Sequence, residues 1–494
     1  MDIRGPRLRK PSDEALAFTS SMADDGRIAR KVILVNLAHM VALVRAGEVD
    51  RKVGARCAKF LAGASAEILP GAKAEDFHQQ LEQAAVDALG VETAGFINYG
   101  KSRNDQVATA IRMELRDSII ALVSSVAGLQ SALLSQARKH GAVLVPGYTH
   151  LQRAQPTTFA HHLFAHFDAF QRDAERALQL YTRVNLSPMG SAAMTGTSVK
   201  LDRRYVAGLL GFSGLVRNSM DAVSSRDFAV EALSFAAIAA LDASRLAEEL
   251  ILWSSAEFGF IELDDSYAAS SSIMPQKKNA VTAEMARAKA GSVIGGLVAA
   301  CAILKALPYS YNLDLQEITP HLWRGIDDAT ASLSVLAGMV ASASLMKGRL
   351  NSAVSGDGST AVGLANYLVS ERGISFRQAH AMVGELVRAS AESGSPLQEV
   401  AVSRLARVSA DLGKKVSVDR VTIESLLDPQ RFLERIATKG GANPRSMLRE
   451  IRQREAVITS TRSSLSTLKA ELTASERRLR ATTDGLTREV KSVD

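Results

Sequence analysis

The chain has 494 residues, of which 47% are hydrophobic and only 5% aromatic, and its formal net charge is +7. The length exceeds what one hydrophobic core supports, and the composition favours packed helices over a sandwich of sheets. Basic residues are interspersed with acidic ones, without a basic block or interleaved aromatic residues, so we expect no nucleic-acid partner. A modest positive charge suits a small anionic substrate equally well.

The cysteines and the N-terminus indicate a cytoplasmic protein. Cys57 and Cys301 are the only two cysteines, and neither lies in a Cys-x-x-Cys motif or near a pair of histidines. This pattern indicates neither a disulfide framework nor a zinc site. The segment MDIRGPRLRKPSDEALAF at the N-terminus is charged and lacks the apolar stretch of a secretory signal. We therefore expect a chain in the reducing cytoplasm, with no cofactor and no membrane partner.

Residues 1–103 are predicted to form a mostly helical N-terminal domain. The hydroxyls of residues 19–21 precede a helical segment, a position where such side chains commonly cap a helix. Residues 98–106, NYGKSRNDQ, are more polar than a cap requires and immediately precede a long helical segment. Arg103 could bind a carboxylate through two parallel hydrogen bonds, with Asn104 as a neutral donor.

Residues 104–351 are predicted to form a bundle of long helices, which makes the fold all-α. Residues 227–258 contain neither glycine nor proline, and residues 280–307 contain no proline. Residues 118–137 carry no charge and are long enough to cross a bilayer. Apolar residues at 115, 119, 122, 126, 129 and 133 alternate in steps of four and three, however. This spacing is typical of one buried stripe in a helix bundle, so a core helix is the better interpretation.

A polar turn at residues 146–156 separates the first two long helices. His150 lies in this turn and is a candidate acid–base group, because the ordinary pKa of histidine is about 6.5. His161, His162 and His166 follow within a helical run, where histidines are more often packed or exposed than catalytic. Their spacing could suggest a metal site, but no carboxylate is interleaved, so no metal is expected.

Residues 262–284, ELDDSYAASSSIMPQKKNAVTAE, form a polar, serine-rich interruption among the long helices. The composition is compatible with a flexible linker and with a functional loop. Because the segment leads into a helix, it could present a hydroxyl, an ammonium and an amide group to an anion. Further polar patches flank helix ends at residues 218–227 and 309–317, and none of the patches forms a complete site alone.

The C-terminal part of the chain is predicted to contain two units. Residues 352–454 would form a small helical domain with frequent glycine breaks. Residues 455–494 would form a tail that is helical or partly disordered. A heptad-compatible stripe in this tail consists of Leu465, Leu468, Leu472, Leu479, Leu486 and Val490.

Three segments resemble the signatures of one family. SSIMPQKKN at residues 271–279 resembles the signature loop of the fumarase/aspartase superfamily, in the form typical of argininosuccinate lyases. SRNDQ at residues 102–106 and YTHLQRAQP at residues 148–156 resemble the other two signatures of the same lyases, in the same order. The resemblance extends from about residue 10 to about residue 440, and the tail after about residue 454 lies outside it.

This resemblance implies a three-domain fold whose central long helices assemble into the 20-helix core of a homotetramer. Each active site would take one signature from each of three subunits, which would explain why the polar patches of one chain are incomplete. The implied reaction is the reversible anti elimination of argininosuccinate, a small molecule, to arginine and fumarate in arginine biosynthesis.

The resemblance also assigns catalytic roles. Ser271 would be the base that removes a proton from carbon, with Lys277 lowering the pKa of its hydroxyl. His150 would be the general acid, or would orient it, with Glu284 holding the imidazole. The alternative assignment makes His150 the base and a water molecule the acid.

Two further groups of residues would bind the substrate. The fumarate portion would contact Ser21, Arg103, Asn104, Thr149, Lys277 and Asn279. The arginine portion would contact Asp25, Arg226, Tyr311 and Gln316. Asp25 would supply the negative charge that complements a guanidinium or ammonium group.

The chain departs from the family pattern in several places. NYGK at residues 98–101 replaces the usual His-Thr-Gly-Arg, Ser270 replaces a glycine, Ala280 and Val281 replace Pro-Asp, and Thr319 or a neighbour replaces a lysine. A Cβ at residue 270 narrows the backbone conformations through which the loop could close. Two alternatives therefore stay open: a lyase that releases fumarate from a different succinyl-amine, and a structural homologue without catalysis.

Overall fold

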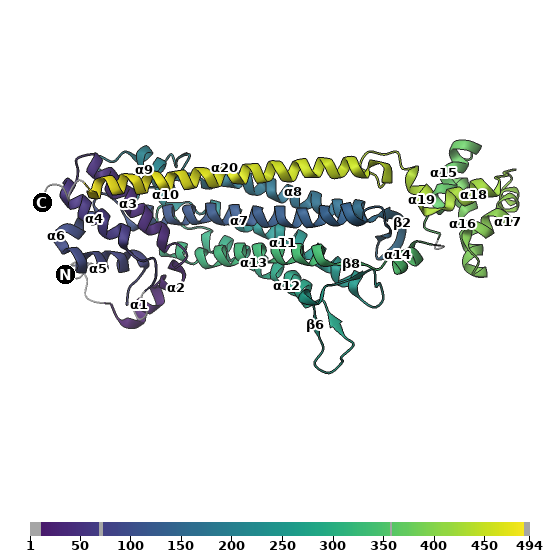
Figure 1. Cartoon of the computed structure of the whole chain (residues 1–494), viewed down its shortest axis with the longest axis horizontal. Coiled ribbons are helices and arrows are strands. Elements are labelled where there is room, and N and C mark those ends of the chain that lie inside the picture. The colour runs from purple at the N-terminus through teal and green to yellow at the C-terminus, as the bar shows by residue number, and fades with distance from the viewer. Residues whose placement is uncertain (1–10, 69–72, 356–357, 489–494) are drawn as a thin grey trace.

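The computed structural model describes residues 11–68, 73–355 and 358–488. It confirms the all-α prediction, because long helices lying side by side form an elongated body with shorter helices at both ends (Figure 1). The described strands pair only in two-stranded sheets. The fold therefore depends on contacts between helices.

Short helices form the end of the body where the chain begins. They are α1 (Asp13–Thr19), α2 (Met22–Asp25), α3 (Ala29–Arg45), α4 (Arg51–Gly63), α5 (Phe77–Leu89), α6 (Val91–Ala94) and the 3₁₀ helix η1 (Gly95–Asn98). Asp76 begins α5, because its Oδ1 accepts a hydrogen bond of 2.7 Å from the Gln79 N–H. This cap holds Asp76 next to the start of the long helix that follows.

Five long helices form the body. They are α7 (Arg103–His140), α8 (Phe159–Val184), α11 (Asp227–Ser254), α12 (Val281–Leu304) and α13 (Ile318–Ser342). α11 packs against α8, α12 and α13, and α7 packs against α8 and α13. The alanines at positions 232, 236, 240, 243 and 247 of α11 are buried, and their small side chains let neighbouring helices approach closely.

Short connections at the helix ends carry the remaining strands and turns. β1 (Leu144–Thr149) pairs with β2 (Gln152–Thr158), β3 (Leu186–Ser187) with β4 (Gly214–Leu215), β5 (Ile261–Glu262) with β8 (Ser344–Leu345), and β6 (Ala269–Ser270) with β7 (Lys278–Asn279). The short helices here are α9 (Arg203–Leu209), α10 (Ser219–Ser224), η2 (Asp265–Tyr267), η3 (Leu313–Gln316) and α14 (Lys347–Val354). The β6–β7 hairpin extends away from the body (Figure 1).

A second group of short helices lies at the opposite end of the body (Figure 1). It contains α15 (Ala361–Arg372), α16 (Phe376–Ser393), α17 (Leu397–Asp411), α18 (Arg420–Leu427) and α19 (Pro429–Glu434). Buried residues between Leu364 and Leu427 form a hydrophobic core separate from the main one. These helices therefore have a core of their own, as expected for a small domain.

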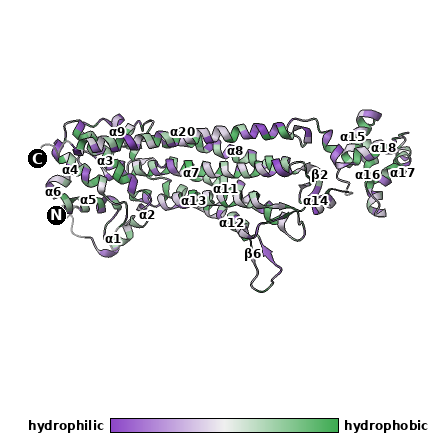
Figure 2. Cartoon of the chain, viewed as in Figure 1, coloured by the Kyte–Doolittle hydropathy of each residue, from purple (hydrophilic) through white to green (hydrophobic). Residues whose placement is uncertain are grey.

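The last helix returns along the body. After the turn η4 (Pro444–Ser446), α20 (Met447–Arg488) packs against α7, α4 and α3, and hydrophilic and hydrophobic residues alternate along it (Figure 2). The predicted leucine stripe supplies this contact: Leu465, Leu479 and Leu486 are buried in the main core, whereas Val490 lies outside the described residues. The boundary expected at residue 454 falls inside α20, so residues 455–488 continue the body.

Two of the described helices, α7 and α12, are long and apolar enough to cross a bilayer by length and composition. The most apolar stretch of α7 is 67% buried inside the chain, as predicted for a core helix. The corresponding stretch of α12 is only 22% buried. α12 therefore carries an apolar surface that this single chain leaves exposed.

We expect Leu479→Ala to lower the free energy of unfolding by about 2–5 kcal/mol, because it creates a cavity under α20. Leu479 is 2% exposed, whereas Leu448 on the first turn of the same helix is 63% exposed. Leu448→Ala is the matched control and should change stability by less than about 0.5 kcal/mol. Guanidinium unfolding followed by circular dichroism measures both variants, and equal effects would contradict the docking of α20.

Candidate functional site

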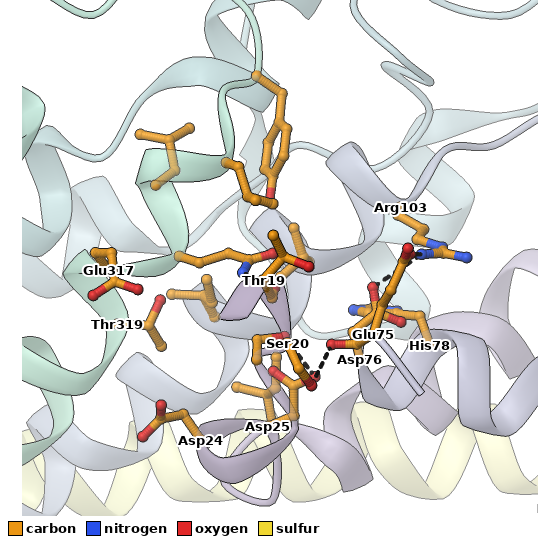
Figure 3. Close-up of a pocket in the computed structure, with 18 of the residues that line it drawn as sticks. Thr19, Ser20, Asp24, Asp25, Glu75, Asp76, His78, Arg103, Glu317 and Thr319 are labelled. Atoms are coloured by element: carbon orange, nitrogen blue, oxygen red, sulfur yellow. Dashed lines mark hydrogen bonds and ion pairs between the residues drawn. The ribbon is translucent and has the colours of Figure 1, made fainter. Parts of the chain in front are cut away.

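A cavity of about 390 Å³ lies where the N-terminal helices meet the start of α7 (Figure 3). Polar side chains that line it are Thr19, Ser20, Ser21, Asp24, Asp25, Glu75, Asp76, His78, Arg103, Asn104, Arg226, Tyr311, Gln316, Glu317 and Thr319. They come from five regions of the chain that lie far apart in sequence. Seven residues predicted to bind substrate are therefore brought together: Ser21, Asp25, Arg103, Asn104, Arg226, Tyr311 and Gln316.

Asp25 is a buried acid at the wall of this cavity. Its Oδ2 accepts hydrogen bonds from the Phe77 N–H at 2.8 Å and from the Ser21 hydroxyl at 3.1 Å. Burial raises the pKa of Asp25 to about 6, although the Phe77 and Ser21 hydrogen bonds partly oppose the shift. The Ser21 side chain does not act as a helix cap, because it makes no cap hydrogen bond to α2. It donates its hydrogen bond to the Asp25 carboxylate instead.

Arg103 lies at the first position of α7 and binds two acids. Its Nη1 is 3.0 Å from Glu75 Oε2 and 3.2 Å from Asp76 Oδ2, and both contacts are drawn in Figure 3. Asp76 Oδ1 meanwhile caps α5, so one carboxylate positions both a helix and the guanidinium. The sequence analysis did not include Glu75 and Asp76 in the site. Two adjacent acids just before a helix could have indicated a partner for a nearby arginine.

The start of α7 is fixed by its cap. The Ser102 hydroxyl accepts from the Asn104 N–H, and Asp105 Oδ1 accepts from the Ser102 N–H at 3.1 Å. The second oxygen of Asp105 accepts from the N–H groups of Gly190 and Ala192, at 3.0 and 2.9 Å. Asn104 donates to the Ala193 carbonyl at 3.1 Å. This network holds the SRNDQ segment rigidly against residues 190–193.

Arg226 and Tyr311 form the inner part of the cavity. Arg226 is 2% exposed and donates from Nη1 to the carbonyls of Ser225, at 2.8 Å, and Val223, at 3.3 Å. Burial lowers the pKa of Arg226 to about 10 and raises the pKa of Tyr311. Gln316 donates to the Thr19 carbonyl at 3.2 Å, which ties the 309–317 segment to the N-terminal helices.

The predicted base, Ser271, lies in a different place, at the base of the turn that closes the β6–β7 hairpin. Its Oγ accepts hydrogen bonds from the N–H groups of Ile273, at 3.2 Å, and Met274, at 3.0 Å. Lys277 donates its N–H to the Met274 carbonyl at 3.0 Å, and Asn279 lies in β7. Glu284 is exposed in the first turn of α12.

Ser270, which replaces a family glycine, lies in β6 opposite Lys278. It is absent from the described non-glycine residues that have a positive φ angle. In this conformation of the hairpin, the Cβ of Ser270 therefore causes no left-handed backbone strain.

The two-residue turn between β1 and β2 holds His150 at the end of the body opposite to the cavity. His150 and Leu151 have φ angles of 54° and 56°, and Thr149 pairs with Gln152 across the turn. Hairpin turns of this kind favour asparagine and glycine, so two ordinary side chains here cost about 1–3 kcal/mol each. The β1–β2 pairing holds the exposed His150 in this strained conformation at the tip of the hairpin, and strain of this kind is common at functional sites.

One chain therefore carries three separate groups of predicted site residues. The cavity lies at the start of α7, and the turn with Thr149 and His150 follows the end of that helix. The 38 residues of α7 span about 57 Å at 1.5 Å per residue. Ser271, Lys277 and Asn279 lie on the hairpin that extends from the side (Figure 1).

Comparison with known proteins gives matches over nearly the whole chain. A family model described as Lyase matches residues 9–295, and one described as Argininosuccinate lyase C-terminal matches residues 358–434. The argininosuccinate lyase of Methanothrix thermoacetophila is 43% identical over 484 residues, covering 97% of this chain and 98% of that protein. That of Methanoculleus marisnigri is 44% identical over 462 residues, covering 92% and 93%. The tail after about residue 454 was expected to lie outside the resemblance. This expectation was wrong, because the first match covers 97% of the chain and must include most of the tail.

Solved structures agree with these matches. EDDS lyase in complex with formate superposes with a TM-score of 0.86, is 29% identical, and covers 98% of this chain and 97% of that one. The class II fumarase of Schistosoma mansoni, at 15% identity and a TM-score of 0.71 over 86% of this chain and 96% of that one, shares the fold. By the two family models and the identity to relatives over almost its full length, the chain belongs to the argininosuccinate lyase family of the fumarase/aspartase superfamily.

Proposed function

We propose that this chain cleaves argininosuccinate reversibly to arginine and fumarate, in the cytoplasm, at sites assembled from three subunits of a homotetramer. The reaction rests on the identity to argininosuccinate lyases over nearly the full length, and the shared sites rest on the separation of the three groups of site residues along one rigid chain. Arg103 begins α7 and His150 follows its end, so the helix, about 57 Å long, keeps them too far apart to contact a single small substrate. Antiparallel packing of neighbouring chains would bring the start of one α7 close to the end of another.

The exposed surface of α12 supports this assembly. Val281, Met285, Ile294 and Val298 on α12 are 38%, 58%, 37% and 62% exposed, and Leu241 on α11 is 47% exposed. Apolar side chains gathered on adjacent long helices are typical of a surface that another chain covers. Five long helices from each of four chains would form the 20-helix core.

In the proposed mechanism, Ser271 removes the proton from the carbon next to a substrate carboxylate. A serine hydroxyl becomes a base only when its anion is stabilised. The N–H groups of Ile273 and Met274 already point at Ser271 Oγ, so they would stabilise the negative charge of the alkoxide. Lys277, three residues after Met274 in the same loop, would add a positive charge near the alkoxide.

The electron pair left on carbon would move into the carboxylate to give a dianionic aci-carboxylate. Collapse of this intermediate breaks the carbon–nitrogen bond and forms the double bond of fumarate. The departing guanidinium nitrogen would take a proton from His150, or from a water molecule that His150 orients, while Glu284 holds the imidazole. The assignment of His150 as base and water as acid remains the alternative, and variants of Ser271 distinguish the two.

Substrate recognition would combine the cavity with the two distant groups. The cavity side chains Ser21, Arg103 and Asn104 would bind the fumarate portion, with Thr149, Lys277 and Asn279 added by other subunits. A substrate carboxylate would compete with Glu75 and Asp76 for Arg103. Asp25, Arg226, Tyr311 and Gln316 would bind the arginine portion.

Replacement of Ser271 tests the proposed base. Ser271→Ala should lower kcat for argininosuccinate cleavage by at least about 100-fold, measured by fumarate absorbance, with the mass in light scattering unchanged. Ser272→Ala removes the adjacent hydroxyl and should retain nearly normal turnover. A near-normal rate for Ser271→Ala would refute its role, and absence of fumarate formation by the unmodified chain would refute the substrate.

Mixing of inactive variants tests the shared site. Ser271→Ala and Arg103→Ala chains, unfolded together and refolded, should regain up to about a quarter of the normal activity, because some sites take both intact residues from different chains. A mixture of Ser271→Ala with Lys277→Ala should stay inactive, since both residues lie on one loop. Failure of the first mixture, with each variant correctly assembled, would contradict sites shared between chains.

The raised pKa of Asp25 predicts how the binding of arginine depends on pH. The carboxylate attracts a cation only when it is ionised, and its pKa in the free protein is about 6. The affinity for arginine, measured calorimetrically, should therefore fall as the pH is lowered from 7.5 to 5.5. Asp25→Asn should bind arginine weakly at both pH values. A variant with the same pH dependence as the unmodified chain would exclude Asp25 as the cation's partner.

A further inference from the structure

Three side chains with metal-binding groups meet between α8 and α11, outside the proposed active site. The Nε2 atoms of His162 and His166 lie 2.6 and 2.8 Å from the same oxygen, Oε2 of Glu249. One potential ligand atom from each residue lies within 4.8 Å of the others. Among the described residues, this is the only such group of three histidine, cysteine or acidic side chains.

The arrangement follows from helix geometry. His162 and His166 are four residues apart on α8, so their side chains share one face of the helix. Glu249 comes from α11, which packs against α8, and this is why the sequence showed no interleaved carboxylate. His161 takes no part, because its ring bonds to the Thr157 hydroxyl at 2.8 Å and the Gly440 carbonyl at 3.0 Å.

The surroundings hold these groups in place. The His162 ring stacks on Trp253 with centroids 4.6 Å apart, and it meets the His166 ring edge-on at 5.4 Å. Although burial alone would raise it, hydrogen bonds from the two imidazoles lower the pKa of Glu249, so its carboxylate is ionised. The side chains of His162 and His166 are 25% and 11% exposed, which leaves the group partly shielded from water.

A small cavity adjoins the group. It measures about 30 Å³, is lined by His162 and Glu249, and is otherwise mostly apolar, with Phe159, Leu250 and Trp253 among its walls. A space of this size matches one water molecule, which would need a bound ion as its partner because the walls are mostly apolar. Two imidazole nitrogens, a carboxylate oxygen and a position for water are the ligand set of a tetrahedral zinc-type site.

We propose that His162, His166 and Glu249 bind one divalent transition-metal ion of the zinc type, with water or a small ligand at the fourth position. The ion would take the place of the two hydrogen bonds to Glu249, and each Nε2 would bind it after its proton is released to water or moved to Nδ1. Metal–ligand bonds of about 2.0–2.1 Å place tetrahedral ligand atoms about 3.3 Å apart, so each Nε2 would move away from Glu249 Oε2 by about 0.5–0.7 Å, which side-chain rotation allows. The ion would link α8 to α11, two helices that carry the core of the body.

Binding of Zn²⁺ to the untagged full-length chain, stripped with a chelator, tests the site. Titration calorimetry should give one ion per chain, and Co²⁺ should produce the intense visible absorption of a tetrahedral complex. His162→Ala, His166→Ala and Glu249→Gln should each weaken binding by at least about 10–100-fold. His380→Ala is the matched control, because His380 lies exposed on a helix in the C-terminal part of the chain. The Zn²⁺ affinity of this control variant should equal that of the unmodified chain.

Thermal unfolding provides a second measurement that does not depend on activity. An excess of Zn²⁺ should raise the unfolding temperature of the unmodified chain and of His380→Ala by several degrees, but not that of His166→Ala. Glu249→Gln keeps the size of the side chain and a hydrogen-bond acceptor, so retention of its helical signal separates a lost ligand from a lost fold. Absence of binding to the unmodified chain, or unchanged binding by Glu249→Gln and His166→Ala, would overturn the proposal.

Discussion

The length and rigidity of α7 set the distances on which the rest of the structure depends. One end of this helix carries the cavity around Arg103, and the other leads into the turn that holds His150. A helix with an apolar stripe buried on several neighbours cannot bend enough to bring its ends together. Every group of predicted site residues is therefore fixed relative to the bundle, and in the proposed tetramer the packing of chains would complete each site.

The cavity is organised by buried and half-buried charges that restrain one another. Asp25 accepts two hydrogen bonds, and Arg103 binds Glu75 and Asp76. Asp105, in the first turn of α7, accepts hydrogen bonds from three backbone N–H groups. Removing such groups from water is unfavourable unless hydrogen bonds replace the lost hydration. Their partners therefore keep the side chains in position, which would reduce the ordering that binding of the proposed substrate requires.

Two local features prepare the distant groups for chemistry. The Ser271 oxygen already faces two backbone N–H groups, which would stabilise a negative charge on it. His150 sits in a left-handed conformation that few residues other than glycine adopt, so the surrounding β1–β2 pairing must hold it there. The two N–H groups favour a reactive Ser271 hydroxyl. The fixed backbone of the turn sets the orientation of the His150 side chain.

The amino-acid sequence by itself determined the helical class, the long central helices and the three signature segments. Apolar spacing along residues 115–133 dictates a buried helical stripe, and the identity of short polar motifs does not depend on neighbours in space. Family membership followed from those motifs, because three of them in order are rarely found together by chance. The leucine stripe in the tail was visible too, but not the surface that it covers.

Only the tertiary structure decided which polar residues meet. Ser21, Arg226 and Tyr311 are separated by many residues and line one cavity because α2, α11 and the 309–317 segment converge at one end of the body. Glu249 joins His162 and His166 for the same reason, across two helices packed side by side. Helical periodicity is local, whereas these contacts depend on how whole helices pack, and packing depends on every buried side chain at once.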